Sequence, residues 1–203
     1  MTIRKGEAWG ETMSAPPQLP LLRNDTTVHQ WIVRHRLLGE PITPFGIAGG
    51  DLARTLGGGT PDRFAGETVR VCLDVVRVEA NGEVTWSTSH VVARRGWWRG
   101  QVLFAMTAQF FDGLDLAPRA HPNDGKVDVL TIDAALSVRD RVVAKRRART
   151  GTHVPHPSIA TSQVAELQVR FDRRMVLWVD GERFTTASEF RLVVEPDAYV
   201  AFV

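Results

Sequence analysis

Apolar and polar residues alternate along much of the second half of the chain. From Ala165 to Phe171, in VAELQVRF, every second residue is apolar, which is the pattern of a β-strand with one solvated face. Residues 67–93 read as two strands that meet at Asn81-Gly82, the dipeptide that best suits a tight type I′ turn. Further strand-like runs occupy the last thirty residues. We therefore predict a β-rich domain over residues 61–203.

Two segments show helical rather than strand periodicity. In residues 27–38, TVHQWIVRHRLL, apolar residues recur near helical spacing, with Thr26 or Thr27 available as the N-cap and Gly39 as the stop. In residues 137–151, SVRDRVVAKRRARTG, Ser137 and Asp140 resemble a capping box. Each segment predicts one helix.

The first sixty residues differ from the rest. Residues 42–59, ITPFGIAGGDLARTLGGG, predict a short strand, a glycine-rich turn and a brief helix. Residues 1–20 contain SAPPQLP and little periodicity, so we expect a loose N-terminal arm. The outline is an α+β fold: a small α/β piece at residues 21–60, then the β-rich domain with one inserted helix.

Composition narrows the class of protein. The chain has 203 residues, 43% of them hydrophobic and 24% charged, which suits one ordinary domain or two small ones. Its net charge of +2 is too small to indicate nucleic-acid binding. The single cysteine, Cys72, cannot form an internal disulfide, and neither a long apolar run nor a secretory signal is visible. These features predict a cytoplasmic protein.

Two surface features leave alternatives open. Basic residues crowd residues 139–149, which indicates either a solvated helix face or a surface that attracts phosphates or an anionic membrane. Trp97 and Trp98, flanked by arginines, suit either a membrane interface or packing against the core. His153 and His156 are expected to make structural hydrogen bonds rather than to bind metal.

Four short stretches occur in a recognisable order: RNDTTVHQWI, PFGIAGGDLARTLG, APRAHPNDGKVDVL and VDGERF. In order and spacing they resemble the motifs of the diacylglycerol kinase catalytic family, which includes bacterial lipid kinases and sphingosine kinases, and the resemblance covers residues 21–203. RTGTHVPHPSI resembles a further stretch of that family. The resemblance implies that residues 21–60 are part of an α/β nucleotide-binding lobe and that residues 61–203 are a sandwich-like lipid-kinase C-terminal domain.

The resemblance also implies roles for individual residues. Glu182 of Asp-Gly-Glu would be the general base, Asp51 a further catalytic carboxylate and Asp124 a Mg²⁺ ligand, with Asp25 helping to organise the metal. Glycine-rich turns at helix starts expose backbone N–H groups to nucleotide phosphates. The residues assigned to ATP in this way are Asp25, Thr26, Thr27, Gly46, Gly49 and Gly50.

The same residues allow simpler interpretations. Asp25 and Asp51 suit helix caps or turns as well as they suit metal or nucleotide contacts. Asp124 and Glu182, in NDG and DGE, equally suit hairpin turns.

The chain departs from the family pattern at the first motif. Where the family has Gly-Gly-Asp-Gly-Thr, residues 23–27 are Arg-Asn-Asp-Thr-Thr, so the three glycines that permit close approach of a phosphate are replaced. Only residues 1–20 precede this motif, too few for the family's nucleotide lobe. We therefore expect a homodimer or a partner chain to complete the lobe and to cover exposed strand edges.

Two functions follow from the resemblance. The first is ATP- and Mg²⁺-dependent phosphoryl transfer to a lipid or other alcohol hydroxyl, impaired or dependent on a partner. The second is a non-catalytic, pseudokinase-like relative that binds a lipid, a peripheral membrane surface or a partner chain. Neither function involves nucleic acid.

Overall fold

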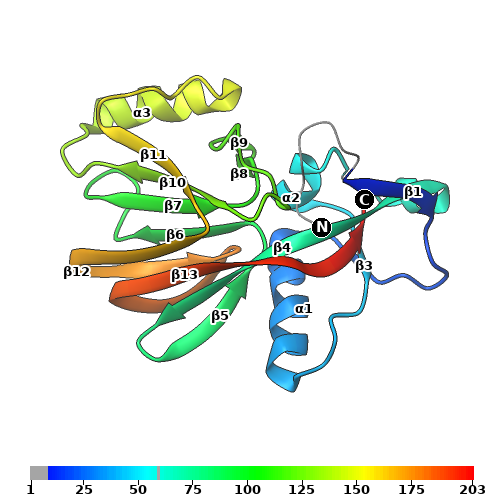
Figure 1. The fold of residues 1–203 in the computed structure, drawn as a ribbon. Coiled ribbons are helices and arrows are strands. Elements are labelled where there is room, and N and C mark those ends of the chain that lie inside the picture. Colours follow the sequence, from blue (N-terminus) through cyan, green and yellow to red (C-terminus); the bar gives the residue numbers. More distant parts are fainter. Residues whose placement is uncertain (1–8, 59) are drawn as a thin grey trace.

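The computed structural model describes residues 9–58 and 60–203, and Figure 1 shows a β-rich molecule with few helices. Within this part of the chain, eleven strands form one sheet. Its main path runs, in spatial order, through β1 (Gly10–Ser14), β4 (Glu67–Ala80), β13 (Glu182–Phe202), β12 (Glu166–Val179), β6 (His90–Arg94), β7 (Val102–Met106), β10 (Val127–Ile132) and β11 (Ile159–Val164).

Three further strands join this sheet, and two form a separate hairpin. β5 (Glu83–Ser87) pairs with β4, β3 (Phe45–Ile47) pairs with β13, and β2 (Leu21–Leu22) pairs with β3. The separate hairpin consists of β8 (Phe110–Phe111) and β9 (Leu114–Asp115).

The sheet folds over a central apolar core, which makes it sandwich-like. Val78 of β4 and Leu192 of β13 belong to the same buried cluster as Val91 of β6, Leu103 of β7 and Val129 of β10. Since side chains alternate between the two faces of a strand, Val92, Phe104 and Leu130 point to the opposite face, where they belong to a second buried cluster. The predicted β-rich, sandwich-like α+β fold is confirmed, and Asn81 and Gly82, with φ of 53° and 80°, form the predicted hairpin turn.

Helix α1 (Asp25–Leu38) packs its apolar side against the edge of the sheet. Val28 and Ile32 are fully buried with Phe45 of β3. The sequence predicted Thr26 or Thr27 as the N-cap, and this detail was wrong: Asn24 is the N-cap, and its side chain accepts a hydrogen bond from the Thr27 backbone N–H. An amide accepts this bond as well as a hydroxyl does, so the composition alone did not distinguish the candidates.

Helix α3 (Val138–Arg147) covers the outer face of β7 and β10, as Figure 1 shows. Its N-cap is Ser137, which accepts from the Asp140 N–H, and a 3₁₀ turn (Ala148–Thr150) leads to Gly151 at φ 66°. The predicted second helix and its N-cap are confirmed, whereas its α-helical part ends at Arg147 and the 3₁₀ turn continues to the predicted stop at Gly151.

The first sixty residues share the sheet of the later ones. Phe45 of β3 pairs in parallel with Ala201 of β13, and a short helix, α2 (Gly50–Thr55), follows β3. A 3₁₀ turn (Pro61–Ala65) then leads into β4. Where the sequence predicted a loose arm over residues 1–20, residues 10–14 form β1 along β4, while residues 1–8 lie outside the described part. An exposed edge strand carries no apolar alternation, so its sequence resembles a loop.

Two further properties concern the lengths of the helices and the single cysteine. Within residues 9–58 and 60–203, the helices are all too short or too polar to span a bilayer. Cys72 is a free, half-buried thiol on β4.

Candidate functional site

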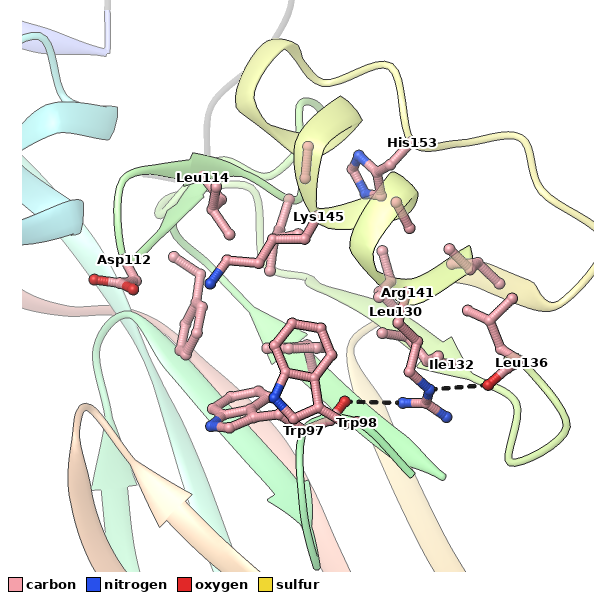
Figure 2. A pocket seen from close by; sticks show the side chains of 16 residues that line it. Trp97, Trp98, Asp112, Leu114, Leu130, Ile132, Leu136, Arg141, Lys145 and His153 are labelled. Atoms are coloured by element: carbon pink, nitrogen blue, oxygen red, sulfur yellow. Dashed lines mark hydrogen bonds between the residues drawn. The ribbon is translucent and has the colours of Figure 1, made fainter. Parts of the chain in front are cut away.

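An apolar pocket lies beneath helix α3, bounded by the β8–β9 hairpin and by β7 and β10 (Figure 2). Its volume of about 280 Å³ is close to the low end of small-molecule pockets, which span roughly 300–1,000 Å³. The apolar side chains that line it are Trp97, Trp98, Phe104, Phe111, Leu114, Leu116, Leu130, Ile132, Leu136, Ala144, Ala148 and Ile159. A space of this size and polarity suits one alkyl chain.

A few polar groups accompany this apolar lining. Asp112 and Lys145 lie at one side of the pocket in Figure 2, and His153 lies close to α3. His153 is 3% exposed, and it interacts with the Leu116 backbone, although the geometry falls short of a well-formed hydrogen bond. Burial lowers the pKa of His153, which favours the neutral imidazole. His156, by contrast, accepts from the Ser158 N–H.

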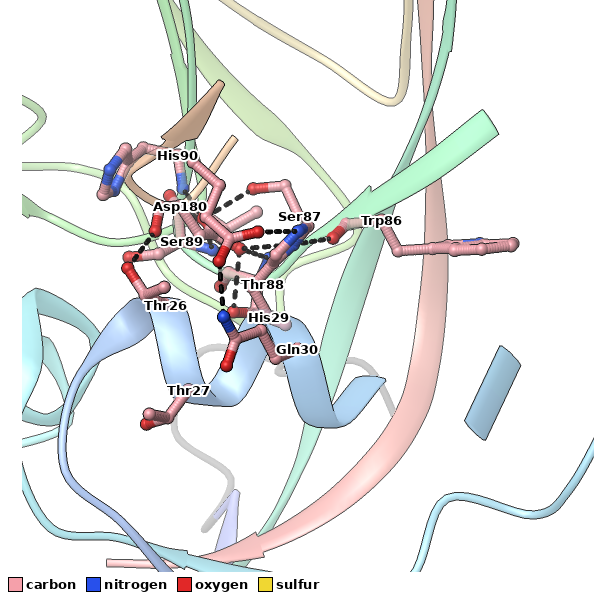
Figure 3. Close-up of polar contacts among 12 residues, drawn as sticks. Thr26, Thr27, His29, Gln30, Trp86, Ser87, Thr88, Ser89, His90 and Asp180 are labelled. Carbon is pink, nitrogen blue, oxygen red and sulfur yellow. Dashed lines mark hydrogen bonds and ion pairs between the residues drawn. The ribbon is translucent and has the colours of Figure 1, made fainter. Parts of the chain in front are cut away.

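A second, polar region centres on Asp180, in the turn between β12 and β13 (Figure 3). Its buried carboxylate accepts hydrogen bonds from the backbone N–H groups of Thr88, Ser89 and His90, at 2.7, 3.1 and 2.7 Å, and from the Ser87 hydroxyl at 2.9 Å. Asp180 therefore fixes the β12–β13 turn to the segment between β5 and β6. This role of Asp180 is not visible in the sequence, because Asp-Gly is typical of an ordinary turn.

Glu182, the predicted general base, begins β13 beside helix α1. Its carboxylate accepts a hydrogen bond from the Gln30 amide, and His29 Nε2 lies 3.7 Å from Glu182 Oε2. His29 Nδ1 lies 2.8 Å from the Trp86 carbonyl oxygen, which can only accept, so Nδ1 carries a proton. The Glu182 side chain is 41% exposed, and it is free to meet a hydroxyl group from solvent.

The apolar pocket and this polar region are neighbours. The ring of Phe111, in the pocket wall, makes an edge contact with His90 at 4.8 Å between centroids. His90 in turn donates its backbone N–H to Asp180. One residue therefore separates the pocket wall from the turn that carries Glu182.

The first turn of α1 docks directly on that turn. Thr26 Oγ1 donates to the Asp180 carbonyl at 2.8 Å. Gly181 has φ of 90°, and a Cβ there would come within 2.9 Å of Thr26 Oγ1, so this close approach requires glycine. Thr26 thus joins the first and last motifs.

Asp25 joins the first motif to the second. Its two carboxylate oxygens accept from the backbone N–H groups of Asp51 and Leu52, at 2.8 and 2.9 Å, so Asp25 caps helix α2. Burial raises the pKa of Asp25, and these two bonds partly offset the rise. Gly50 has φ of 94°, and a Cβ there would lie 2.8 Å from Asp25 Oδ2.

Asp51 holds a different loop. Its carboxylate accepts from the N–H groups of Asp112, at 2.6 Å, and Gly113, at 3.1 Å, which form the β8–β9 turn. Asp51 and Glu182, predicted together as catalytic, therefore contact different segments. Because Asp112 lines the pocket, Asp51 supports the pocket wall.

The remaining residues predicted to hold ATP are packed against the chain itself. Thr27 completes the capping box of α1 with Asn24. A Cβ on Gly46 would lie 2.6 Å from the ring of Phe64, and one on Gly49 would lie 2.3 Å from the Arg23 carbonyl oxygen. These glycines permit close packing within the chain.

Asp124, the predicted Mg²⁺ ligand, belongs to a separate acidic group. It lies in the loop before β10, with Asp74 and Asp128 as its charged acidic neighbours, and it accepts from the Lys126 N–H at 3.0 Å. Burial, reinforced by the charges of Asp128 and Asp74, raises the pKa of Asp124 to about 6. Asp74 itself accepts from the backbone of Gly125 and Asp197.

The raised pKa of Asp124 leads to a pH prediction. The folded state holds this proton more tightly than the unfolded state, so the contribution of Asp124 to stability falls as pH rises from 3.8 to about 6. Asp124→Asn keeps the acceptor for Lys126 N–H but removes the charge. We expect the variant to be more stable than wild type above pH 6, by about 1 kcal/mol because partial exposure screens the charge.

Urea titrations across this pH range would measure that difference. It should shrink toward zero near the lower end of the range, where Asp124 is protonated in both states. A difference that stays constant with pH would show that the Asp124 charge is not its cause.

Within the described part of the chain, the residues predicted to hold Mg²⁺ and ATP phosphates are engaged with other parts of the chain. Within the described chain, no three His, Cys, Asp or Glu residues are grouped so that they could hold a metal ion. The helix N-termini near the first two motifs donate N–H groups to side chains of this chain: Thr27 to Asn24, and Asp51 and Leu52 to Asp25. A phosphate would have to displace these partners.

The fold of this chain is similar to those of solved structures. A diacylglycerol kinase from Bacillus anthracis str. Sterne superposes with a TM-score of 0.58 and 12% sequence identity, over 88% of this chain and 73% of the other. A provisionally assigned diacylglycerol kinase from the same organism gives a TM-score of 0.64 at 12% identity, over 88% and 74% of the two chains. At this identity the similarity concerns the fold.

A sequence-family model supplies the assignment. A search of curated proteins found no match. Residues 74–201, more than half of the chain, match the model described as the YegS C-terminal NAD kinase beta sandwich-like domain. These residues contain Asp180, Glu182, Asp124 and the whole apolar pocket. The chain therefore belongs to the YegS C-terminal NAD kinase beta sandwich-like family.

Proposed function

We infer that this protein binds the alkyl chain of a lipid or other long-chain alcohol in the pocket beneath α3. The observation that carries this function is the pocket itself, whose lining is mostly apolar and aromatic. Pockets of this kind bind apolar ligands and orient them by a few polar groups. Lys145, Asp112 and the buried His153 are those groups here.

In this proposal, phosphoryl transfer from ATP is impaired or depends on a partner chain. Asp25 and Asn24 already use the N–H groups that would face phosphates. A partner chain that supplies its own phosphate-binding loop would remove the need for these groups, whereas a homodimer, whose second copy has the same capped N-termini, would serve to cover exposed strand edges. We propose that the protein acts in the cytoplasm, the location that the sequence predicts.

One observation favours phosphoryl transfer as a second candidate function. Glu182 differs from Asp25, Asp51 and Asp180 because, among the described residues, its carboxylate accepts a hydrogen bond from a side-chain amide and from no backbone N–H group. It is half-exposed, it lies beside His29 Nε2, and it begins β13 directly after the Asp180 turn, which His90 links to the pocket wall. A carboxylate in this place could accept the proton of an alcohol hydroxyl as a general base.

Contact quenching by a brominated long-chain alcohol tests the lipid-binding proposal. Trp97 and Trp98 line the pocket, whereas the other four of the six tryptophans do not. We expect saturable quenching of wild-type fluorescence, and its loss when both residues are replaced by phenylalanine. Quenching that the replacement leaves unchanged would place the alcohol elsewhere and contradict the proposal.

Calorimetry with Mg²⁺ and ATP tests the nucleotide part. We expect no saturable heat from the isolated chain at millimolar ATP, because both helix N-termini near the motifs are already capped. Saturable binding that Asp25→Ala abolishes would instead establish a working phosphate loop. Phosphorylation of a lipid alcohol that Glu182→Gln abolishes would then support the kinase function.

A further inference from the structure

Large apolar side chains are exposed beside the pocket, on two neighbouring elements. Trp97 and Trp98, in the loop between β6 and β7, are 40% and 46% exposed. Val138 and Val142 of α3 are 44% and 51% exposed, and their spacing of four residues places them on the same side of the helix. We call these four residues the α3–loop surface.

Arg141 ties the two elements together. Its side chain is buried and donates to the carbonyl oxygens of Trp97 and Gly100 in the loop, and to those of Leu136 and Asp133 before α3. Figure 2 shows two of these bonds, to Trp97 and Leu136. The loop therefore keeps its place beside the helix, and the exposed apolar residues form a preorganised surface.

The charge around this surface is strongly positive. Asp140 is the single acidic residue within residues 94–99 and 138–149. The exposed basic residues of the same two segments are Arg95, Arg99, Arg139, Lys145, Arg146, Arg147 and Arg149. Helices that lie in the interface of an anionic membrane have this composition: exposed apolar residues, including tryptophan, are surrounded by arginine and lysine.

We propose that the α3–loop surface docks on an anionic lipid bilayer, with Trp98 and Val142 entering the headgroup region and the surrounding arginines contacting lipid phosphates. A nucleic acid would also meet the positive charge, but it offers no apolar phase for exposed valines. Because Trp98 and Lys145 also line the pocket, docking would bring the pocket to the membrane. Docking does not require the pocket to hold a lipid, so either proposal can fail alone.

Vesicle flotation with the full chain tests the docking. The two vesicle types are phosphatidylcholine alone and phosphatidylcholine mixed with phosphatidylglycerol. We expect binding to the mixed vesicles only. Arg139→Glu combined with Arg146→Glu should weaken it by about tenfold or more, since one basic residue near an anionic surface contributes about fivefold. Trp98→Ser should weaken it by about tenfold through lost apolar burial.

Matched variants on other surfaces serve as controls. Leu37→Ser removes an exposed apolar residue from the end of α1, where Leu37 is 72% exposed, and Arg173→Glu reverses an exposed charge on β12. Both should bind vesicles like wild type. Absence of vesicle binding, equal binding to neutral vesicles, or equal loss in the controls would overturn the proposal. Binding of a DNA fragment in place of vesicles would also overturn it.

Discussion

Replacing Asp180 by alanine is expected to lower the free energy of unfolding by about 3–5 kcal/mol. The substitution leaves the backbone N–H groups of Thr88, Ser89 and His90 buried without an acceptor, and it also removes the partner of the Ser87 hydroxyl. Each buried, unsatisfied polar group costs about 1–3 kcal/mol, and relaxation of the segment recovers part of the sum. Figure 3 shows how these donors converge on one carboxylate.

Urea denaturation, followed by circular dichroism, measures this loss. Asp180→Asn, which keeps one acceptor and tolerates the φ of 46° at this turn, should lose less than Asp180→Ala. Asp172→Ala, at an exposed position of the same strand, is the control and should change stability by less than about 0.5 kcal/mol. If Asp180→Ala lowers the free energy of unfolding by no more than Asp172→Ala does, the Asp180 carboxylate does not hold the segment between β5 and β6.

Filling the pocket from helix α3 is expected to abolish binding of a long-chain alcohol. Ala144 lines the pocket, and Ala144→Phe would place a ring in a space of about 280 Å³. The ring would take up part of this space and shorten the room left for an alkyl chain. We expect the dissociation constant for the brominated alcohol to rise by at least about tenfold, which corresponds to about 1.4 kcal/mol.

Val143→Phe is the matched control for this effect. Val143 is the preceding residue of the same helix, is exposed, and does not line the pocket. It should bind the alcohol like wild type, and both variants should retain the wild-type circular dichroism spectrum. Equal binding by Ala144→Phe and wild type would mean that the alcohol does not enter the pocket.

Local signals in the sequence predicted most of the fold. The Asn81-Gly82 turn, the strand alternation before Phe171 and the Ser137 cap of α3 each depend on residues close in sequence. β1 was not predicted because an exposed edge strand lacks an apolar period. The pairing of β3 with β13 joins residues about 156 positions apart, and no local pattern reports such a contact.

The site was harder to predict for the same reason. The motifs indicated Asp25 and Asp51, but their actual partners, the α2 backbone and the β8–β9 turn, depend on tertiary packing. The role of Asp180 was not predicted, because its donors lie about ninety residues earlier in the sequence. The pocket could not be predicted, since its walls come from several separate segments.

Photo-crosslinking with a long-chain alcohol that carries a diazirine on its chain would test the central claim most directly. After photolysis, peptide mass spectrometry locates the adducts. The account predicts adducts on residues of the pocket wall, in segments 97–116 and 130–159, and their loss on competition with unlabelled monoolein. Adducts confined to other segments, or adducts that monoolein does not suppress, would contradict a lipid site beneath α3.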